Sequence, residues 1–301
     1  MWAAPRIDMK NAFSDLHPWV NFAFFALTLV FSMIFMHPAY LAAMLIAALL
    51  CHASLYGWRK TARTAAGMLP VFLVLSIVNP IFNRYGQRVL FTYFGRNYTL
   101  EALYYGMAIA TMFIGVLIWF SCYSAVMTSD KFVALFGGLM PSISLLLVMV
   151  FRLVPSYQRR AKAILAARGG VGMGVGQSAN RREQIAQGMI VLSALTGWAL
   201  ESAITTADAM RSRGYGTSKR TSFQIYRFTL RDAAFAAIMG ILAAGCIAAA
   251  IMGAARAQYT PYLSIAPVQP VGFICYALFL LTPSAINCWE KIAWHISISR
   301  I

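Results

Sequence analysis

The chain has 301 residues, of which 60% are hydrophobic and only 11% are charged, whereas soluble globular proteins carry about 25% charged residues. Its mean hydropathy of +0.67 excludes a soluble protein and predicts an all-α, polytopic membrane protein. Thirteen of its 25 lysines and arginines lie within residues 152–231, between apolar runs, which is typical of a cytoplasmic segment and not of nucleic-acid binding.

Six apolar runs are long enough to cross the roughly 30 Å hydrocarbon core of a bilayer, which takes about 20 residues. They are residues 19–36, 39–56, 67–82, 103–127, 233–255 and 271–289. The third run is short and contains Pro70 and Pro80, so we expect a kinked or partly re-entrant helix there. Arg59, Lys60 and Arg63 follow the second run and predict a cytoplasmic loop at that point.

A seventh apolar run, residues 132–150, has the hydropathy of a span, but the charge pattern argues against a crossing. The third and fourth spans bring the chain back to the side of the first basic loop, so one more crossing would place residues 152–231 on the opposite side. We therefore expect a helix at or below the cytoplasmic interface, interrupted near Gly137, Gly138 and Pro141.

The spans divide the sequence into three parts. Residues 1–128 form an N-terminal membrane domain with four spans, 129–231 form a cytoplasmic domain, and 232–301 carry the last two spans. An even number of crossings places both termini in the cytoplasm. The cytoplasmic domain is predicted to contain two helices, from about residue 142 to 168 and from about 182 to 213, joined by the glycine-rich loop 169–176.

Both of these helices end in a small residue, an arginine and a glycine. The two sequences are Ala167-Arg168-Gly169 and Ser212-Arg213-Gly214. A glycine just past a helix end adopts the left-handed cap conformation without a side-chain clash, and a cation in the last turn meets the negative end of the helix dipole. Either arginine is then a solvated terminal charge or, on a slim tip, a guanidinium that enters a groove of another protein.

The second helix carries many apolar residues, and it is therefore expected to bury one face against the membrane or another helix. These positions include Ile185, Met189, Leu192, Leu195 and Ile204.

Sequence motifs for an independent activity are missing. There is no G-x-x-x-x-G-K-[ST] phosphate loop, and no Asp or Glu lies deep in a predicted span, as ion-coupled carriers usually require. The four histidines and five cysteines have no metal-ligand spacing. No catalytic residue, metal ligand or cofactor site is predicted, and an ion-coupled secondary transporter and a membrane-embedded enzyme remain as alternatives.

Several ordered motifs extend from Leu16-His17-Pro18 to about Thr221. They include Asn79-Pro80-Ile81-Phe82-Asn83, Tyr105-Gly106, Asp130-Lys131-Phe132, Arg152-Leu153-Val154-Pro155, Leu200-Glu201-Ser202-Ala203, and Thr206-Ala207-Asp208-Ala209-Met210-Arg211-Ser212-Arg213-Gly214-Tyr215-Gly216. With these motifs the chain resembles the transmembrane T component of energy-coupling factor transporters, a class of ATP-binding cassette importers for vitamins and metal ions.

The resemblance implies a non-enzymatic scaffold, without a cofactor, in the bacterial cytoplasmic membrane. It would join two cytoplasmic ABC-type ATPase subunits to a substrate-binding S component in the lipid bilayer, and no nucleic acid is involved. Two arginine-bearing tips would contact the ATPases, and further motif residues would support the coupling helices or the membrane part. The tips are Ala167, Arg168, Gly169, Ser212, Arg213 and Gly214; the supporting residues are Glu201, Asp208 and Arg211; the membrane motif is Asn79 and Pro80. The family often has alanine before both arginines, so Ser212 is a departure.

Overall fold

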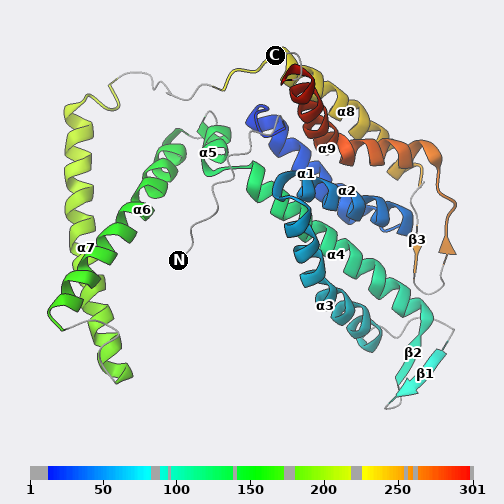
Figure 1. The fold of residues 1–301 in the computed structure, drawn as a ribbon, viewed down its shortest axis with the longest axis horizontal. Helices are drawn as coiled ribbons and strands as arrows, with labels where there is room; N and C mark the ends of the chain where they lie inside the picture. The colour runs from blue at the N-terminus through cyan, green and yellow to red at the C-terminus, as the bar shows by residue number, and fades with distance from the viewer. Residues whose placement is uncertain are drawn as a thin grey trace. The chain divides into compact units, whose positions relative to one another are not determined.

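The computed structural model describes residues 13–82, 89–93, 96–137, 141–172, 180–217, 226–253, 257–259 and 264–298. It is predominantly helical and divides into two compact units (Figure 1). Unit 1 comprises Met1–Thr128 and Tyr226–Ile301, and unit 2 comprises Ser129–Ile225. Both chain termini and the predicted hinge glycines Gly174 and Gly176 lie outside the described residues.

In its described residues, unit 1 contains six helices and two short β-hairpins. The helices are α1 (Pro18–Ile34), α2 (Pro38–Tyr56), α3 (Trp58–Phe82), α4 (Leu100–Val126), α8 (Leu230–Ile251) and α9 (Pro270–Ile298); the hairpins pair β1 (Val89–Tyr93) with β2 (Arg96–Thr99) and β3 (Ala257–Gln258) with β4 (Ser264–Ile265). Each of α1 and α2 begins with a proline. Proline suits the first position of a helix, because an N–H there would have no partner within the helix. The preceding His17 and His37 cap these helices by accepting the N–H of Trp19 and Ala39.

The described helices confirm an all-α polytopic membrane protein, although they do not match every predicted span. Six are long and apolar enough to cross a membrane: α2, α3, α4, α8, α9 as far as Glu290, and α7 (Arg181–Ser212) of unit 2. The predicted span 19–36 corresponds to α1, which has 17 residues and ends at Ile34, before the turn that leads to Pro38. The length and composition of α7 also suit a span, whereas the charge pattern favoured a cytoplasmic helix.

Helix α3 begins nine residues before the predicted span 67–82. The chain turns at Gly57, whose φ of 84° favours glycine, and resumes a helix at Trp58. Arg59, Lys60 and Arg63 therefore belong to the first two turns of α3, and the loop expected there is wrong. A hydrogen bond of 2.8 Å between His52 Nδ1 and Thr61 Oγ1 joins α2 to α3 across the turn.

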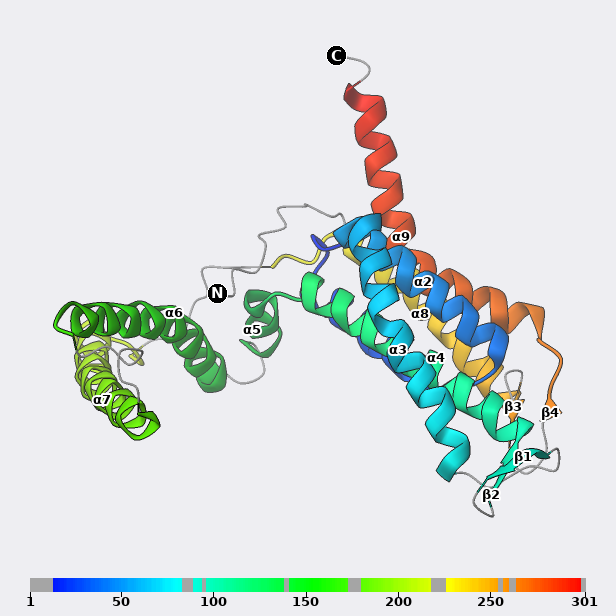
Figure 2. The same ribbon diagram turned by 60° about the horizontal axis from the view of Figure 1, so that its bottom comes forward.

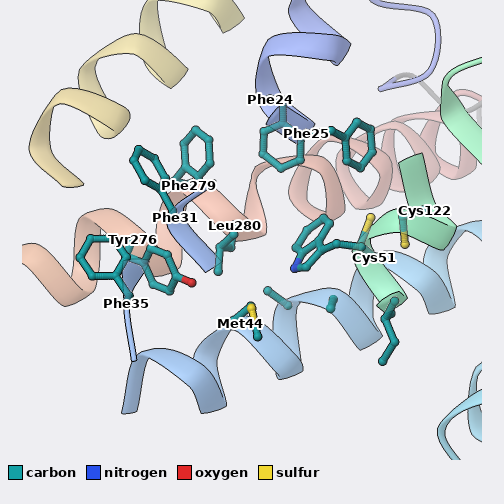
Figure 3. Packing of buried hydrophobic residues seen from close by; sticks show 14 of the residues in the cluster. Phe24, Phe25, Phe31, Phe35, Met44, Cys51, Cys122, Tyr276, Phe279 and Leu280 are labelled. Atoms are coloured by element: carbon teal, nitrogen blue, oxygen red, sulfur yellow. The ribbon is translucent and has the colours of Figure 1, made fainter. Parts of the chain in front are cut away.

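An aromatic core holds unit 1 together (Figure 3). Phe24 of α1 packs edge-on against Trp119 of α4, with ring centroids 5.9 Å apart, and lies 5.2 Å from Phe279 of α9. Tyr276 of α9 lies 5.1 Å from Phe35, just after α1. Edge-to-face pairs of this kind add to the stabilisation that burial alone provides. Sequentially distant helices thus share one core.

Contacts between helices show which ends of unit 1 lie together. Met44 lies where a side chain on Gly115 would be, and the thiols of Cys51 and Cys122 are in contact (Figure 3). Both pairs are separated by 71 residues, so α2 and α4 run parallel, with their C-terminal ends at the same end of the unit. The N-terminal end of α3 lies there too, because it follows α2 after a single residue.

The first turns of α1 and α8 reach this same end. The Asn287 amide Nδ2 donates to Ser54 Oγ of α2 at 3.3 Å, and Asn287 Oδ1 accepts the N–H of Phe13. The His17 N–H, four residues later, donates to Asp232 Oδ1 at 2.8 Å. The chain therefore leaves unit 1 after α4 and re-enters it before α8 at the end that carries the basic first turns of α3.

Unit 2 consists of α5 (Ser129–Gly137), α6 (Pro141–Gly170) and α7. The apolar run 132–150 is shared between α5 and α6, so the predicted interruption near Gly137 and Pro141 is confirmed. Pro141 opens α6, a position where proline fits a helix well. The predicted helices 142–168 and 182–213 correspond closely to α6 and α7.

Candidate functional site

Helices α6 and α7 form an antiparallel pair. Tyr157 of α6 packs edge-on against Trp198 of α7, with centroids 5.4 Å apart, and the guanidinium of Arg160 lies 5.8 Å from the centroid of the same indole. Arg168 Nη2 donates a hydrogen bond to Gln187 Oε1. Between the Tyr157–Trp198 contact and the Arg168–Gln187 contact, the residue number rises by eleven on α6 and falls by eleven on α7, as it must in an antiparallel pair. The two helices cross in Figure 2. The two contacts lie about 16 Å apart along the helices.

The first arginine tip differs from the prediction. Gly169 is not a left-handed cap: α6 continues through Gly169 to Gly170, and the positive φ of 77° occurs at Gly172. Two hydrogen bonds between residues three apart close the helix. The Val171 N–H donates to the Arg168 carbonyl, and the Gly172 N–H donates to the Gly169 carbonyl. Arg168 is half-buried, and its Nε is buried without a hydrogen-bond partner among the described residues. Its guanidinium therefore faces α7 and is only partly exposed to solvent.

The second arginine tip has the glycine cap conformation that the sequence predicts. Arg213 is the C-cap of α7 and Gly214 follows with φ of 72°, a conformation that glycine adopts at little cost. The Gly214 N–H bonds to the Arg211 carbonyl and the Tyr215 N–H bonds to the Met210 carbonyl, both at 3.0 Å. This paired pattern is the Schellman motif, which fixes the direction of the chain beyond the helix. Arg213 itself is exposed.

The residues before the arginines are both exposed, and they keep the tips slim in different ways. Ala167 has only a methyl group, whereas the Ser212 hydroxyl donates to the Asp208 carbonyl of its own helix at 2.9 Å. The serine hydroxyl is thus satisfied locally, so Ser212 presents a small surface. The two tips differ in the environment of the arginine. Arg168 is held against α7, whereas Arg213 is exposed to solvent.

The apolar surface of α7 has almost no cover within the described chain. Val191 is its one buried residue. Four of the residues expected to bury a face are more than half exposed, namely Ile185, Met189, Leu192 and Ile204. Of the two covers expected for this face, a helix of the described chain does not supply it, and burial by the membrane stays a prediction. Exposed apolar surface of this extent is typical of a site that contacts lipid or another protein.

The remaining predicted site residues lie in both units. Glu201, Asp208 and Arg211 are exposed on the C-terminal half of α7, and they lie on the solvent-accessible surface of unit 2. Pro80 is buried and Asn79 is half-buried near the C-terminal end of α3. A Cβ added to Gly106 of α4 would lie 2.8 Å from the Ser76 carbonyl oxygen and 3.0 Å from Asn79 Cβ. The Asn79-Pro80 and Tyr105-Gly106 motifs thus meet where α3 and α4 approach closely.

Sequence reasoning missed the residues that join α6 to α7. Gln187, Tyr157 and Trp198 carry no motif, and their roles emerge only from the register of the two helices. The spacing of Tyr157, Arg160 and Arg168 along one face of α6 is the signal that could have indicated a shared contact surface.

Comparison with known proteins does not assign this chain to a family. No family model matches it, and no curated protein matches it. Its function must therefore be inferred from its own residues.

Proposed function

We propose that this chain is the transmembrane coupling subunit, or T component, of an energy-coupling factor importer for a vitamin or a metal ion. In this role it transmits the ATP-driven motion of two cytoplasmic ABC-type ATPases to a substrate-binding S component in the same bacterial cytoplasmic membrane. The observation that carries the proposal is α7, a 32-residue helix with one buried residue and an exposed arginine at its C-cap. Such a helix needs partners along its length and at its tip.

Helix α7 has the properties of a lever. Its 32 residues extend about 48 Å. The Asn180 side chain caps the first turn by accepting the Arg182 N–H, and the Schellman motif closes the last turn. Both ends are thus held helical, and a force applied at Arg213 moves the apolar surface around Leu192 and Ile204. An ATPase groove with carboxylates or backbone carbonyls would accept the five donors of the guanidinium.

The charge distribution of unit 1 supports a cytoplasmic location for residues 129–225. The chain enters and leaves this segment at the end of unit 1 where Arg59, Lys60 and Arg63 are exposed. Basic residues near membrane helices favour the cytoplasmic side. The same orientation gives the tips of α6 and α7 access to cytoplasmic ATPases.

Among the described residues of unit 1, no contact favours the ion-coupled carrier. The buried carboxylates there, Glu101 and Asp232, lie in the first turns of α4 and α8 and not midway along a span. Asp232 accepts hydrogen bonds from His17 N–H, Thr229 N–H and the Thr229 hydroxyl, which is a capping arrangement. Its carboxylate oxygens are therefore used to hold the start of α8.

The proposal is tested by purifying the tagged chain from its native membranes in mild detergent. We expect two ATPase subunits and a small membrane protein to co-purify, and the complex to hydrolyse ATP. Arg213→Glu should lower co-purified ATPase activity by about tenfold or more, because truncating or reversing one partner of a buried charge pair costs 2–5 kcal/mol. Arg168→Glu alone should have a smaller effect, since that side chain faces α7. The double variant should abolish ATP-driven uptake.

Arg182→Glu is the matched control, because it makes the same charge change at an exposed position in the first turn of α7. It should keep both co-purification and uptake, and all variants should insert into the membrane normally. ATP hydrolysis by the chain alone, or uptake that survives the double reversal, would contradict the proposal.

A further inference from the structure

Helix α3 is the least covered membrane helix of unit 1. Only 11% of its apolar window is buried, against 50% for α2. It packs at the edge of the bundle against α4 and α2 (Figure 2). Its uncovered apolar side chains include Leu69, Leu73, Val74, Ile77 and Phe82. In a membrane this surface meets lipid acyl chains, so the first turns of α3 stand beside lipid headgroups.

Those first turns carry an exposed cationic patch, formed by Arg59, Lys60 and Arg63. The buried Thr61, bonded to His52, fixes how this part of α3 is rotated. Arg59 and Arg63 are each two residues from Thr61, so they project about 160° away from it at 100° per residue. The patch therefore faces outward, and no carboxylate in the described part of the chain forms an ion pair with it.

Helix stability does not account for these three cations. They lie at the N-terminal end of α3, where the helix dipole is positive and disfavours positive charge. No acidic residue lies in that first turn to offset them. An anion supplied from outside the protein would remove this repulsion.

Tryptophans indicate that the patch lies at headgroup depth. Trp58 is 69% exposed and directly precedes it. Trp19 in the first turn of α1 and Trp289 near Asn287 of α9 are 47% and 76% exposed at the same end of unit 1. Exposed tryptophans of membrane proteins gather at the boundary between acyl chains and headgroups. Three at one end mark that boundary there.

We propose that Arg59, Lys60 and Arg63, with Trp58 beside them, bind the phosphate headgroup of an anionic phospholipid, whose acyl chains lie along the uncovered face of α3. The two guanidinium groups supply paired donors that suit phosphate oxygens, and Lys60 adds a point charge. The bound lipid would hold in place a helix that the protein itself covers poorly. The proposal does not depend on the coupling role proposed above.

Native mass spectrometry of the purified full-length chain in detergent tests this site. Phosphatidylglycerol and phosphatidylcholine are added separately, to the wild type and to the variant Arg59→Gln/Lys60→Gln/Arg63→Gln. The wild type should bind phosphatidylglycerol in clear preference, and the variant should bind it about tenfold more weakly or worse, because each headgroup-level cation contributes to the attraction. Arg59→Lys/Arg63→Lys should retain most of the binding.

The matched control removes three exposed cations of unit 2, as Arg159→Gln/Lys162→Gln/Arg182→Gln. An equal loss in this control would overturn the site, because net charge alone would then explain binding. So would wild-type binding of phosphatidylcholine with equal affinity, or release of phosphatidylglycerol by millimolar inorganic phosphate. Should the first variant not fold, a photoreactive phosphatidylglycerol on the wild type decides: cross-links to the start of α3 support the proposal, and cross-links elsewhere refute it.

Discussion

Helices α2 and α7 are both long and apolar enough to span a membrane, yet they are covered very differently. Half of the apolar window of α2 is buried in unit 1, whereas 6% of that of α7 is buried. Helix α2 packs against α4 and α9, and among the described elements α7 packs mainly against α6, through a few side chains. Hydropathy thus indicates that a helix is buried away from water, but it does not indicate whether protein or lipid surrounds the helix. In unit 1 the chain supplies the cover, whereas the described residues leave most of α7 uncovered.

Matched leucines give the largest expected difference between these regions. Leu280 of α9 is fully buried in the aromatic core, and Leu200 of α7 is 63% exposed (Figure 3). Leu280→Ala should destabilise unit 1 by roughly 2–5 kcal/mol, because it removes buried methyl groups and leaves a cavity. Leu200→Ala should change stability by no more than about 0.5 kcal/mol. Denaturant titration of the purified chain, followed by circular dichroism, measures both. Equal losses would mean that Leu200 is covered within the isolated chain.

Matched glycines give the next largest difference, with opposite signs. A Cβ on Gly106 would lie 2.8 Å from a backbone oxygen of α3, which cannot move cheaply, whereas Gly197 of α7 has no atom within 4 Å of the corresponding position. Gly106→Ala should destabilise unit 1 by about 1–3 kcal/mol through overpacking. Gly197→Ala should stabilise α7 by up to about 1 kcal/mol, because alanine is the better helix former. Thermal unfolding measures both, and a neutral Gly106→Ala would rule out the close α3–α4 contact.

The fold class and most helix positions could be predicted from the sequence, because both follow from local features. Long apolar runs, Pro141 at a helix start and Gly214 after a helix end act within a few residues, and each is found where expected. The early start of α3 could not be predicted in this way. Its first turn depends on the His52–Thr61 hydrogen bond between two helices, which hydropathy does not report.

The two arginine tips show the same limit. Their sequences are almost identical, and local reasoning treated them as equivalent. The structure separates them because Gln187, nineteen residues beyond Arg168, reaches its guanidinium only through the antiparallel register of α6 and α7. Gly169, which has the sequence of a cap, is instead helical. Contacts between helices thus decide the environment of each arginine.

The smallest predicted effect concerns the different environments of Arg168 and Arg213. Gln187→Leu should remove the hydrogen bond from Arg168 and leave Tyr157 and Trp198 as the main link between α6 and α7. We expect a loss of about 1 kcal/mol, below the usual range for a hydrogen bond to a charged group, because the site is half-exposed. Spin labels at Lys162 and Ala194, exposed positions on the two helices, should then show a broader distance distribution by pulsed electron resonance.

Gln158→Leu, an exposed glutamine on α6, is the matched control and should leave the distribution unchanged. A narrow distribution in Gln187→Leu would mean that the aromatic contact alone sets the geometry, so that Arg168 is as free as Arg213. In that case charge reversal at either arginine should impair ATPase association equally. The opposite outcome is a broadened distribution together with a weaker effect of Arg168→Glu than of Arg213→Glu. It would mean that the Arg168–Gln187 contact causes the difference between the tips, because the same hydrogen bond then orders α6 against α7 and keeps one guanidinium from binding partners.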